Sequence, residues 1–406
     1  MMNWKKCKLG DVATTTTTKI GCSDITSNYI STENMLPNKG GVVAASSFPS
    51  TGNVSTYQQG DILISNIRPY FKKIWRATCN GTASNDVIIF CANEGVDNLY
   101  LYYLLADDRF FAYVMTGAKG TKMPRGDKKQ MLQYPVNLPP LEEQKRIADI
   151  LGAFDDKIEL LQKQNKTLED MAKALFKSWF VDFDVVRAKQ KGLPKADIMR
   201  EYHLTEELYD LFPSSFADSP LGPIPSSWEV KTLGDVVVCH DSKRVPLSNR
   251  ERSEKQGPYP YYGATSIMDH VENYLFDGIF LLLGEDGSVV KPDGTPFLQY
   301  VFGKIWVNNH AHVLQGKGNI RTEYLYLFLS DVQIQPYVTG AVQAKLNQKN
   351  MNSIPLCVAN EEIIKIFQGN IDIVFTKIRA NLKQIQTLTE LRDTLLPRLI
   401  SGKIRV

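Results

Sequence analysis

Apolar residues recur at alternating steps of three and four between residues 141 and 180. The positions that carry this pattern are Ile147, Leu151, Phe154, Ile158, Leu161, Leu168, Ala172, Leu175 and Trp179. This spacing is the a and d pattern of a coiled coil, so the sequence predicts one long helix over Leu141–Phe180. The pattern breaks only at Asn165, which occupies an a position. Such a helix would be about 60 Å long, which is typical of a spacer or a dimerising arm.

The same seam returns near the C-terminus at residue numbers larger by 220. Its members are Phe367, Ile371, Val374, Ile378, Asn381, Ile385, Leu388, Arg392, Leu395 and Leu399. The flanking residues repeat too, because Lys157-Ile158 matches Lys377-Ile378. Two unrelated amphipathic helices could give similar seams, but repeated flanks favour a duplicated helix. We therefore expect the two helices to pack on each other, with the polar seam residues Asn165, Asn381 and Arg392 setting their register.

The repeat extends beyond the helices. Trp4 and the Leu-Gly-Asp-Val of residues 9–12 recur as Trp228 and residues 233–236, shifted by 224. Other landmarks recur in the same order, namely Thr116-Gly117-Ala118 as Thr339-Gly340-Ala341 and Met131 with Pro135 as Met351 with Pro355. The chain is thus a tandem duplication of a globular domain followed by a long helix. The predicted segments are a first domain (1–137), a long helix (138–183), a linker (184–226), a second domain (227–357) and a final helix (358–406).

Each globular domain mixes strand and helix signals, which predicts an α+β fold with a curved sheet. The expected strands are Gly60–Asn66, Val87–Cys91, Ile279–Leu283, Phe297–Phe302 and Lys304–Val307. The expected helices are Leu99–Met115 and Glu323–Val338, each ending near a glycine. Between the halves, Val181–Ser226 is rich in proline, serine and charge, so it is expected to be a linker. We expect it to be packed, because Leu193, Tyr209, Leu211 and Phe216 would be costly to expose.

Composition excludes some classes of protein. With 47 basic and 44 acidic residues the net charge is only +3, so any basic surface must be local. The six cysteines are scattered without a C-x-x-C pair, which favours free thiols in a reducing cytoplasm. The first residues lack the apolar core of a signal peptide, and no apolar run approaches the roughly 20 residues of a membrane span.

The usual signatures of nucleotide-binding enzymes are missing. There is no G-x-x-x-x-G-K-[ST] loop and no G-x-G-x-x-G after a strand. The acidic stretch Gly284–Ser288 is best interpreted as a turn that shapes a binding surface. His310 and His312 lie in a strand-like run without a further ligand cluster, so packing is favoured over a metal site. We therefore expect neither a cofactor nor a metal nor a catalytic residue.

What remains is a set of basic and amide-rich stretches in matching places. The candidate DNA-binding residues are Lys72, Lys73, Lys119, Lys122 and Arg125 in the first half, and Lys243, Arg244, Gln343, Lys345 and Asn347 in the second. Lysines suit phosphates, whereas Arg, Asn and Gln can read base edges. An ordinary solvated loop is the alternative for either stretch alone. The matching positions of residues 118–130 and 343–350 in the two halves favour DNA binding.

Together these motifs resemble the specificity subunit of type I restriction–modification systems. The resemblance covers essentially the whole chain and is carried by Trp4 and Trp228 with their Leu-Gly-Asp-Val sequences, by Leu138–Ile147, Leu221–Trp228, Gly284–Ser288 and Val307–Leu314. One departure is Val358–Glu362, which lacks the Pro-Pro-Leu and the Gln found before the first helix.

The resemblance implies two tandem α/β target recognition domains, separated by long helices that form an antiparallel coiled coil with pseudo-twofold repetition. Each domain would read one half of a split double-stranded DNA target. The helices would set the spacer and dock two modification subunits, which methylate adenine, and restriction subunits would join them. The chain itself would be non-catalytic. Two alternatives remain, a coiled-coil scaffold that does not read sequence and a DNA methyltransferase or nuclease in its own right.

Overall fold

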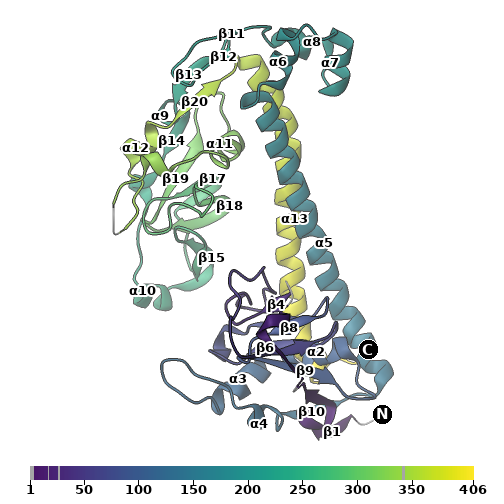
Figure 1. Ribbon diagram of the computed structural model, residues 1–406. Coiled ribbons are helices and arrows are strands. Elements are labelled where there is room, and N and C mark those ends of the chain that lie inside the picture. Colours follow the sequence, from purple (N-terminus) through teal and green to yellow (C-terminus); the bar gives the residue numbers. More distant parts are fainter. Residues whose placement is uncertain (1–3, 17, 26–27, 341–342) are drawn as a thin grey trace. The chain divides into compact units, whose positions relative to one another are not determined.

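The computed structural model describes residues 4–16, 18–25, 28–340 and 343–406 (Figure 1). The chain forms two compact units, one made of Met1–Leu161 with Gln384–Val406 and the other of Gln162–Lys383. Ala341 of the repeated Thr-Gly-Ala, and the first three residues, lie outside the described residues.

The two longest helices are α5 (Leu141–Phe180) and α13 (Glu361–Ile400), each of 40 residues. The long helix that the first seam predicts is confirmed with both of its ends. The second helix lacks the Pro-Pro-Leu sequence at its start but is capped in another way. Asn360 Oδ1 accepts a hydrogen bond from the Ile363 amide at 2.9 Å and so caps its first turn.

Within each unit the two helices run antiparallel. In the second unit the Asn381 amide donates to Asn165 Oδ1 at 2.8 Å, whereas the rings of Phe176 and Phe367 lie 5.8 Å apart. Residue numbers therefore rise along α5 as they fall along α13. In the first unit Arg392 pairs with Asp155 at 2.6 Å.

The seam residues lie on the less exposed side of both helices. Leu151, Leu161, Ile158, Ile371 and Ile378 are buried. The remaining members are partly buried, namely Phe154, Leu168, Val374, Ile385 and Leu388. The polar seam positions find polar partners, since Asn381 is 1% exposed and bonds Asn165 and Gln164. Paired amides at a seam favour one register of the helices.

The first globular part contains two four-stranded sheets. One has the order β2-β9-β6-β7 and the other β3-β5-β8-β4. The bounds are β2 Ala13–Thr15, β9 Val87–Ala92, β6 Ile62–Ser65, β7 Ile74–Arg76, β3 Lys19–Gly21, β5 Asn53–Tyr57, β8 Gly81–Ala83 and β4 Tyr29–Ile30. A separate antiparallel pair joins β1 (Lys5–Lys8) to β10 (Pro135–Leu138), directly before α5.

The second globular part contains a six-stranded sheet of order β14-β19-β17-β18-β15-β16. The bounds are β14 Val237–Cys239, β19 Ala311–Gly316, β17 Phe276–Gly284, β18 Leu298–Val307, β15 Gln256–Tyr262 and β16 Ile267–Val271. Here β13 (Glu229–Thr232) pairs with β20 (Pro355–Val358), directly before α13.

The duplication is visible in strand register. Ala13 pairs with Ala92 in the first part, and Val237 pairs with Gly316 in the second, so both partners are shifted by 224 (237 − 13 and 316 − 92). The sequence repeat therefore corresponds to a repeated strand pair.

Short helices complete each part. The first contains α1 Leu9–Val12, α2 Asn98–Ala106, α3 Asp108–Thr116, α4 Lys128–Met131 and the 3₁₀ turns η1 Cys22–Asp24 and η2 Pro69–Phe71. The second contains α9 Leu233–Val236, α10 Asn249–Glu254, α11 Thr322–Leu329, α12 Gln348–Asn352 and the turns η3 Asp241–Lys243 and η4 Gln335–Tyr337.

Three element predictions need correction. The helix expected over Leu99–Met115 is split into α2 and α3, because Asp107 is extended and its carboxylate caps α3 by accepting from the Arg109 amide at 2.8 Å. The helix expected over Glu323–Val338 ends at Leu329, since the Ile334 amide bonds Gly294 instead at 3.1 Å. The two strands expected at Phe297–Phe302 and Lys304–Val307 are one strand, β18, in which Gly303 adopts a φ of 83°.

The segment between the halves is folded. It contains α6 Asp184–Gln190, α7 Lys195–Glu201, α8 Glu206–Leu211 and the pair β11 Phe216–Ala217 with β12 Ile224–Pro225. Tyr209, Leu211 and Phe216 pack against the core as expected. Leu193 does not, because it lies in the turn between α6 and α7 and is 45% exposed.

Candidate nucleic-acid interface

In the first part the structure joins two basic stretches that are about 50 residues apart in sequence. Arg125 forms an isolated bridge with Ile67, and the Arg68 amide donates to the Pro124 carbonyl at 2.8 Å. The Gly126 amide donates to the Asn66 carbonyl at 3.1 Å. The first loop (residues 118–130) is therefore bonded to the segment that directly follows strand β6.

The second part repeats this docking. The Gly287 amide donates to Ala344 at 3.0 Å, and the Leu346 amide donates to Glu285 at 2.8 Å. The second loop (residues 343–350) is thus bonded to the segment that follows strand β17. Both loop positions are shifted by 220 from the first part (124 to 344, 126 to 346).

Each loop is also closed in the same way at its base. Lys119 and Arg125 exchange two backbone hydrogen bonds of 2.9 Å, and Thr339 and Lys345 exchange two of 2.7 and 2.8 Å. These pairs differ by 220 as well, so Lys345 is the structural counterpart of Arg125. Thr339 is likewise the counterpart of Lys119, so the expected match of Thr339 with Thr116 is wrong.

Two exposed cations of the first loop have acidic neighbours. Arg125, whose side chain is 56% exposed, lies 3.0 Å from Asp86, and Lys119, 82% exposed, lies 3.2 Å from Asp127. Hydrogen bonds from the backbone of Gln130 and from Lys119 lower the pKa of Asp127. Lys122 is exposed at the loop tip. Surface ion pairs of this kind are weak, so an incoming phosphate can exchange with the carboxylate.

The 3₁₀ turn beside the first loop carries backbone strain. Arg68 and Lys72 both adopt left-handed conformations, with φ of 49° and 51°, on either side of that turn. Non-glycine residues in this region cost free energy and are concentrated at binding sites. Lys72 pairs with Asp108 at 2.8 Å, and Lys73 donates to the Thr32 carbonyl at 2.6 Å. Tyr70, which lies between Arg68 and Lys72 in the sequence, is 46% exposed.

The candidates in the second part divide into exposed and engaged side chains. Lys243 and Gln343 are exposed, and Lys345 is 52% exposed and 3.7 Å from Glu285. Asn347 is the N-cap of α12, where its side chain accepts from the Asn350 amide at 2.8 Å. The Arg244 side chain is only 11% exposed, so it lies beneath the surface and is not presented to solvent like Lys243.

A buried charged cluster underlies the second loop. Arg244 donates to Glu285 Oε2 at 2.7 Å and to the Ala311 carbonyl at 2.7 Å. His312, 1% exposed, places Nδ1 at 2.5 Å from Asp241 Oδ2 and Nε2 at 2.7 Å from the Leu346 carbonyl. Burial alone would raise the pKa of Asp241, but the hydrogen bond from His312 and the nearby charges outweigh it and lower that pKa.

Three side chains in this cluster could in principle hold a metal ion. Ligand atoms of Cys239, Asp241 and His312 lie within 4.8 Å of one another. Two observations favour ion pairing instead. Both ring nitrogens of His312 already have partners, and Arg244 Nη2 lies 3.3 Å from the Asp241 carboxylate, where it would repel a cation. Burial also raises the pKa of the Cys239 thiol to about 12, which disfavours the thiolate that metals bind.

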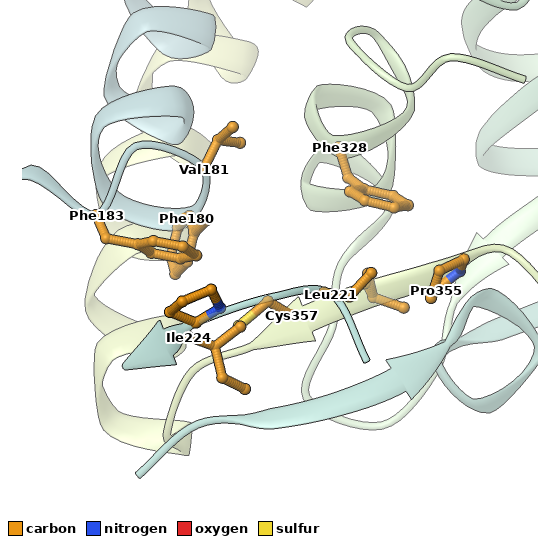
Figure 2. A pocket seen from close by; sticks show the side chains of 10 residues that line it. Phe180, Val181, Phe183, Leu221, Ile224, Phe328, Pro355 and Cys357 are labelled. Atoms are coloured by element: carbon orange, nitrogen blue, oxygen red, sulfur yellow. The ribbon is translucent and has the colours of Figure 1, made fainter. Parts of the chain in front are cut away.

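A pocket of about 220 Å³ lies elsewhere in the second unit, at the end of α5 (Figure 2). Phe180, Phe183, Ile224, Phe328 and Cys357 are among its lining residues, which are mostly apolar. Burial raises the pKa of Cys357 to about 12, so its thiol stays protonated. The pocket therefore lacks the convergent polar groups of a reactive site.

Sequence analysis did not identify Asp86 or Asp241, and it noted Glu285 only as part of an acidic turn expected to shape a binding surface. Asp86, Asp241 and Glu285 hold Arg125, His312 and Arg244 respectively. His312 was visible as a histidine in an apolar strand, but Asp241 lies 71 residues away and no local pattern connects the two. Only the repeat of the loops themselves gave a sequence signal.

Among the described residues, no helix is both long and apolar enough to cross a bilayer.

Comparison with known protein families matches residues 1–170 and 225–391 to the type I restriction modification DNA specificity domain. The two matched ranges correspond to the two halves, each with most of its long helix.

Individual relatives agree with this match. The type I restriction enzyme HindI specificity subunit of Haemophilus influenzae is 26% identical, with all of both chains covered. The MjaIX specificity subunit of Methanocaldococcus jannaschii is 27% identical over 77% of this chain and 70% of its own length. The crystal structure of a type I restriction–modification S subunit from M. genitalium has a TM-score of 0.52 at 17% identity, covering 98% and 96% of the two chains. That likeness supports the same fold.

Proposed function

This chain belongs to the type I restriction–modification DNA specificity family, and from that membership we propose that its two globular parts each read one half of a split DNA target. The observation that carries the proposal is the repeated docking of the two loops. Gly126 and Leu346 make the same backbone bond at positions that differ by 220, and Arg125 and Lys345 occupy the same place in each loop. Two loops held alike but with different side chains are suited to read two different sequences.

The loop side chains suggest how each half-target is contacted. Lys119 and Lys122 are exposed cations that suit phosphates, whereas Arg125 can form the bidentate contact that guanine accepts. In the second loop Gln343 offers an amide and Lys345 a charge. Phosphate contacts would orient the chain, and the few base contacts would carry the sequence preference.

Mapping of methylated adenines tests the proposal. The chain is expressed with its modification partner, and the methylated sequence is determined with the wild type and with two variants. A Lys119→Ala, Lys122→Ala, Arg125→Ala triple variant should relax one half of the target only. A Gln343→Ala, Lys345→Ala double variant should relax the other half only. Methylation of the same sequence at unchanged fidelity in both variants would contradict the proposal.

We further propose that the two long helices dock two modification subunits, one for each half. Met171 on α5 is 60% exposed and Leu391 on α13 is 47% exposed. They differ by 220 in number and so occupy equivalent places in the repeat. Exposed apolar side chains at equivalent positions favour binding of two copies of one partner. Restriction subunits would join this assembly, and the chain itself would be a non-catalytic component of a cytoplasmic complex.

Counting subunits tests this docking. Met171→Asp or Leu391→Asp alone should reduce the number of bound modification subunits from two to one, as measured by native mass spectrometry, and the double variant should bind none. Leu193→Asp is the matched control, because Leu193 is 45% exposed but lies outside both long helices. Two bound subunits in the double variant would contradict the docking site.

A non-reading scaffold is the alternative function. It predicts that DNA is bound without sequence preference and that neither loop variant changes the methylated sequence. The buried ion pairs under the second loop weigh against it, because a loop with no reading role has no need of such precise support.

A further inference from the structure

The most deeply buried titratable side chain in the cluster under the second loop is that of His312, which is 1% exposed. His312 lies on β19, and its Nε2 is 2.7 Å from the carbonyl oxygen of Leu346, which belongs to the second loop. Leu346 itself is fully buried. The contact is therefore a direct, solvent-excluded link from the central sheet to the loop backbone, next to the exposed Lys345.

Both ring nitrogens of His312 face hydrogen-bond acceptors. The Leu346 carbonyl can only accept, so Nε2 carries a proton. Asp241 also accepts from the Val313 amide at 2.9 Å, and these bonds hold its carboxylate ionised, so Nδ1 carries a proton too. A ring that donates from both nitrogens is an imidazolium. The geometry thus points to a doubly protonated, cationic ring at His312.

The surrounding charges explain how a cation is tolerated there. Asp241 and Glu285 are the two carboxylates that face the ring, at 2.5 and 3.8 Å from Nδ1. Arg244 and Lys345 are the other cations, and both contact Glu285. The Cys239 thiol, on the neighbouring strand, stays neutral. A buried charge persists only where it is paired and hydrogen-bonded in this way.

In the first part the place of His312 is taken by an apolar residue. The register of β2 with β9 and of β14 with β19 shifts by 224, which makes Ile88 the equivalent of His312. Ile88 is buried and apolar. The contacts that hold the first loop include its backbone bonds and its surface pair of Arg125 with Asp86, and Ile88 offers no charged link from the sheet.

We propose that His312 is a positioning residue for target reading, which sets the second loop by a charged hydrogen bond to Leu346 and leaves the first loop unaffected. This inference rests on the proposed function, because it assumes that the second loop reads one half of the target. No contact of His312 itself with DNA is implied, since the ring is enclosed.

Two substitutions by amide side chains test the two hydrogen bonds of the His312 ring one at a time. The amide of His312→Gln can reach the place of Nε2 and donate to Leu346, whereas that of His312→Asn reaches only the place of Nδ1 and donates to Asp241. His312→Leu removes both bonds and matches the apolar residue of the first part. Each variant is assembled with the modification partner, and its unfolding temperature and co-purification serve as folding controls.

The readout is methylation of duplex oligonucleotides that carry the mapped target or single base changes in either half. His312→Asn and His312→Leu should lower discrimination against changes in the second half by roughly 10-fold to 100-fold, the effect of losing a charged hydrogen bond. His312→Gln should stay close to the wild type. Discrimination in the first half should be unchanged in all three variants.

Three results would overturn the proposal: unchanged discrimination in the second half, an equal loss in both halves, or equal behaviour of the Gln and Asn variants. The protonation state is checked separately by nitrogen NMR of histidine-labelled chain. Two protonated ring nitrogens should be seen for one histidine and should vanish in His312→Gln. A neutral ring would overturn the charged link even if a variant failed to fold.

The design also separates this inference from the proposed function. If Gln343→Ala with Lys345→Ala leaves the second half of the target unchanged, the loop is not a reader and the proposed function fails. If that variant relaxes the second half whereas the His312 variants do not, only the positioning role fails.

Discussion

At the scale of single residues, the cations at the matching place of the two loops each lie beside an acid. Arg125 lies beside Asp86, and Lys345 lies near Glu285. Under the proposed function these pairs would orient the cations before DNA arrives, and they keep the free charge of the loops low. That agrees with a chain whose net charge is only +3. Few phosphates can then be neutralised by the chain alone, so specificity has to come from a small number of well-placed contacts.

Arg125 is the residue at which a base contact and a phosphate contact can be distinguished. If Arg125 reads a guanine, Arg125→Ala and Arg125→Lys should both weaken discrimination at one base pair, by about 1–3 kcal/mol for Ala, because lysine cannot form the bidentate contact. If it contacts a phosphate, Arg125→Lys should behave like the wild type. Binding of duplexes with single base changes measures the difference.

Glu169 on α5 provides a test of pH dependence. It accepts from the Tyr326 hydroxyl at 2.6 Å and pairs with Lys173. Burial would raise its pKa, but these bonds lower it below the ordinary value of 4.5. A lowered folded-state pKa means that the stabilisation is present above pH 4.5 and is lost as the pH falls through the folded value.

We therefore expect Glu169→Gln to reduce the free energy of unfolding at pH 7 by about 1 kcal/mol, with a smaller deficit below pH 4. Urea denaturation at several pH values measures this. Asp170→Asn is the matched control, because Asp170 is 53% exposed and its pair with Lys166 should contribute little. A deficit for Glu169→Gln that does not depend on pH would contradict the assignment.

At the scale of elements, α5 and α13 share a seam that is apolar except at a few positions. Asn381 is nearly fully buried and donates to both Asn165 and Gln164. Buried amides in a seam lower stability relative to leucine but exclude other registers. The paired amides thus explain how two helices with similar seven-residue patterns adopt one alignment.

Replacing Asn165 and Asn381 should change the free energy of unfolding in a non-additive way. Asn381→Leu alone leaves the Asn165 amide without its partner, so it should destabilise the chain by about 1–3 kcal/mol. Asn165→Leu with Asn381→Leu should recover most of that loss or exceed the wild type. A double-mutant cycle in urea measures the coupling, and additive effects of the two substitutions would show that the amides do not act as a pair.

At the scale of the whole molecule, the chain passes from one unit to the other within the long helices. The division between the units falls at Leu161 within α5 and at Lys383 within α13. No loop among the described residues connects one unit to the other. If the helices set the spacer of a split target, their length should be the relevant variable.

Inserting one heptad into each helix tests this directly. Seven residues after Leu161 and seven after Gln384 keep the seam in phase and leave Asn165 with Asn381 and Asp155 with Arg392. Each helix then gains about 10 Å. An active variant should methylate a target whose spacer is longer by about three base pairs, with both half-sequences unchanged. Methylation of the original spacer by such a variant would show that the helices are not the ruler.

The sequence alone was sufficient for the elements that depend on local pattern. A three–four spacing sustained from Ile147 to Trp179 strongly favours one continuous helix, and α5 was predicted with both ends. The repeat could be read because duplicated segments keep their landmarks, such as the Trp and Leu-Gly-Asp-Val sequences. The helix over Leu99–Met115 was mispredicted because the capping carboxylate of Asp107 outweighs helix propensity at one position.

The tertiary structure alone decided which distant residues meet. The bonds between Asn66 and Gly126, and between Glu285 and Leu346, join segments about 60 residues apart, and no local rule encodes them. The two hydrogen-bond partners of the His312 ring, Asp241 and Leu346, lie on two other segments. Local patterns determine helices and strands because their interactions span a few residues, whereas buried charges depend on partners that only folding brings together.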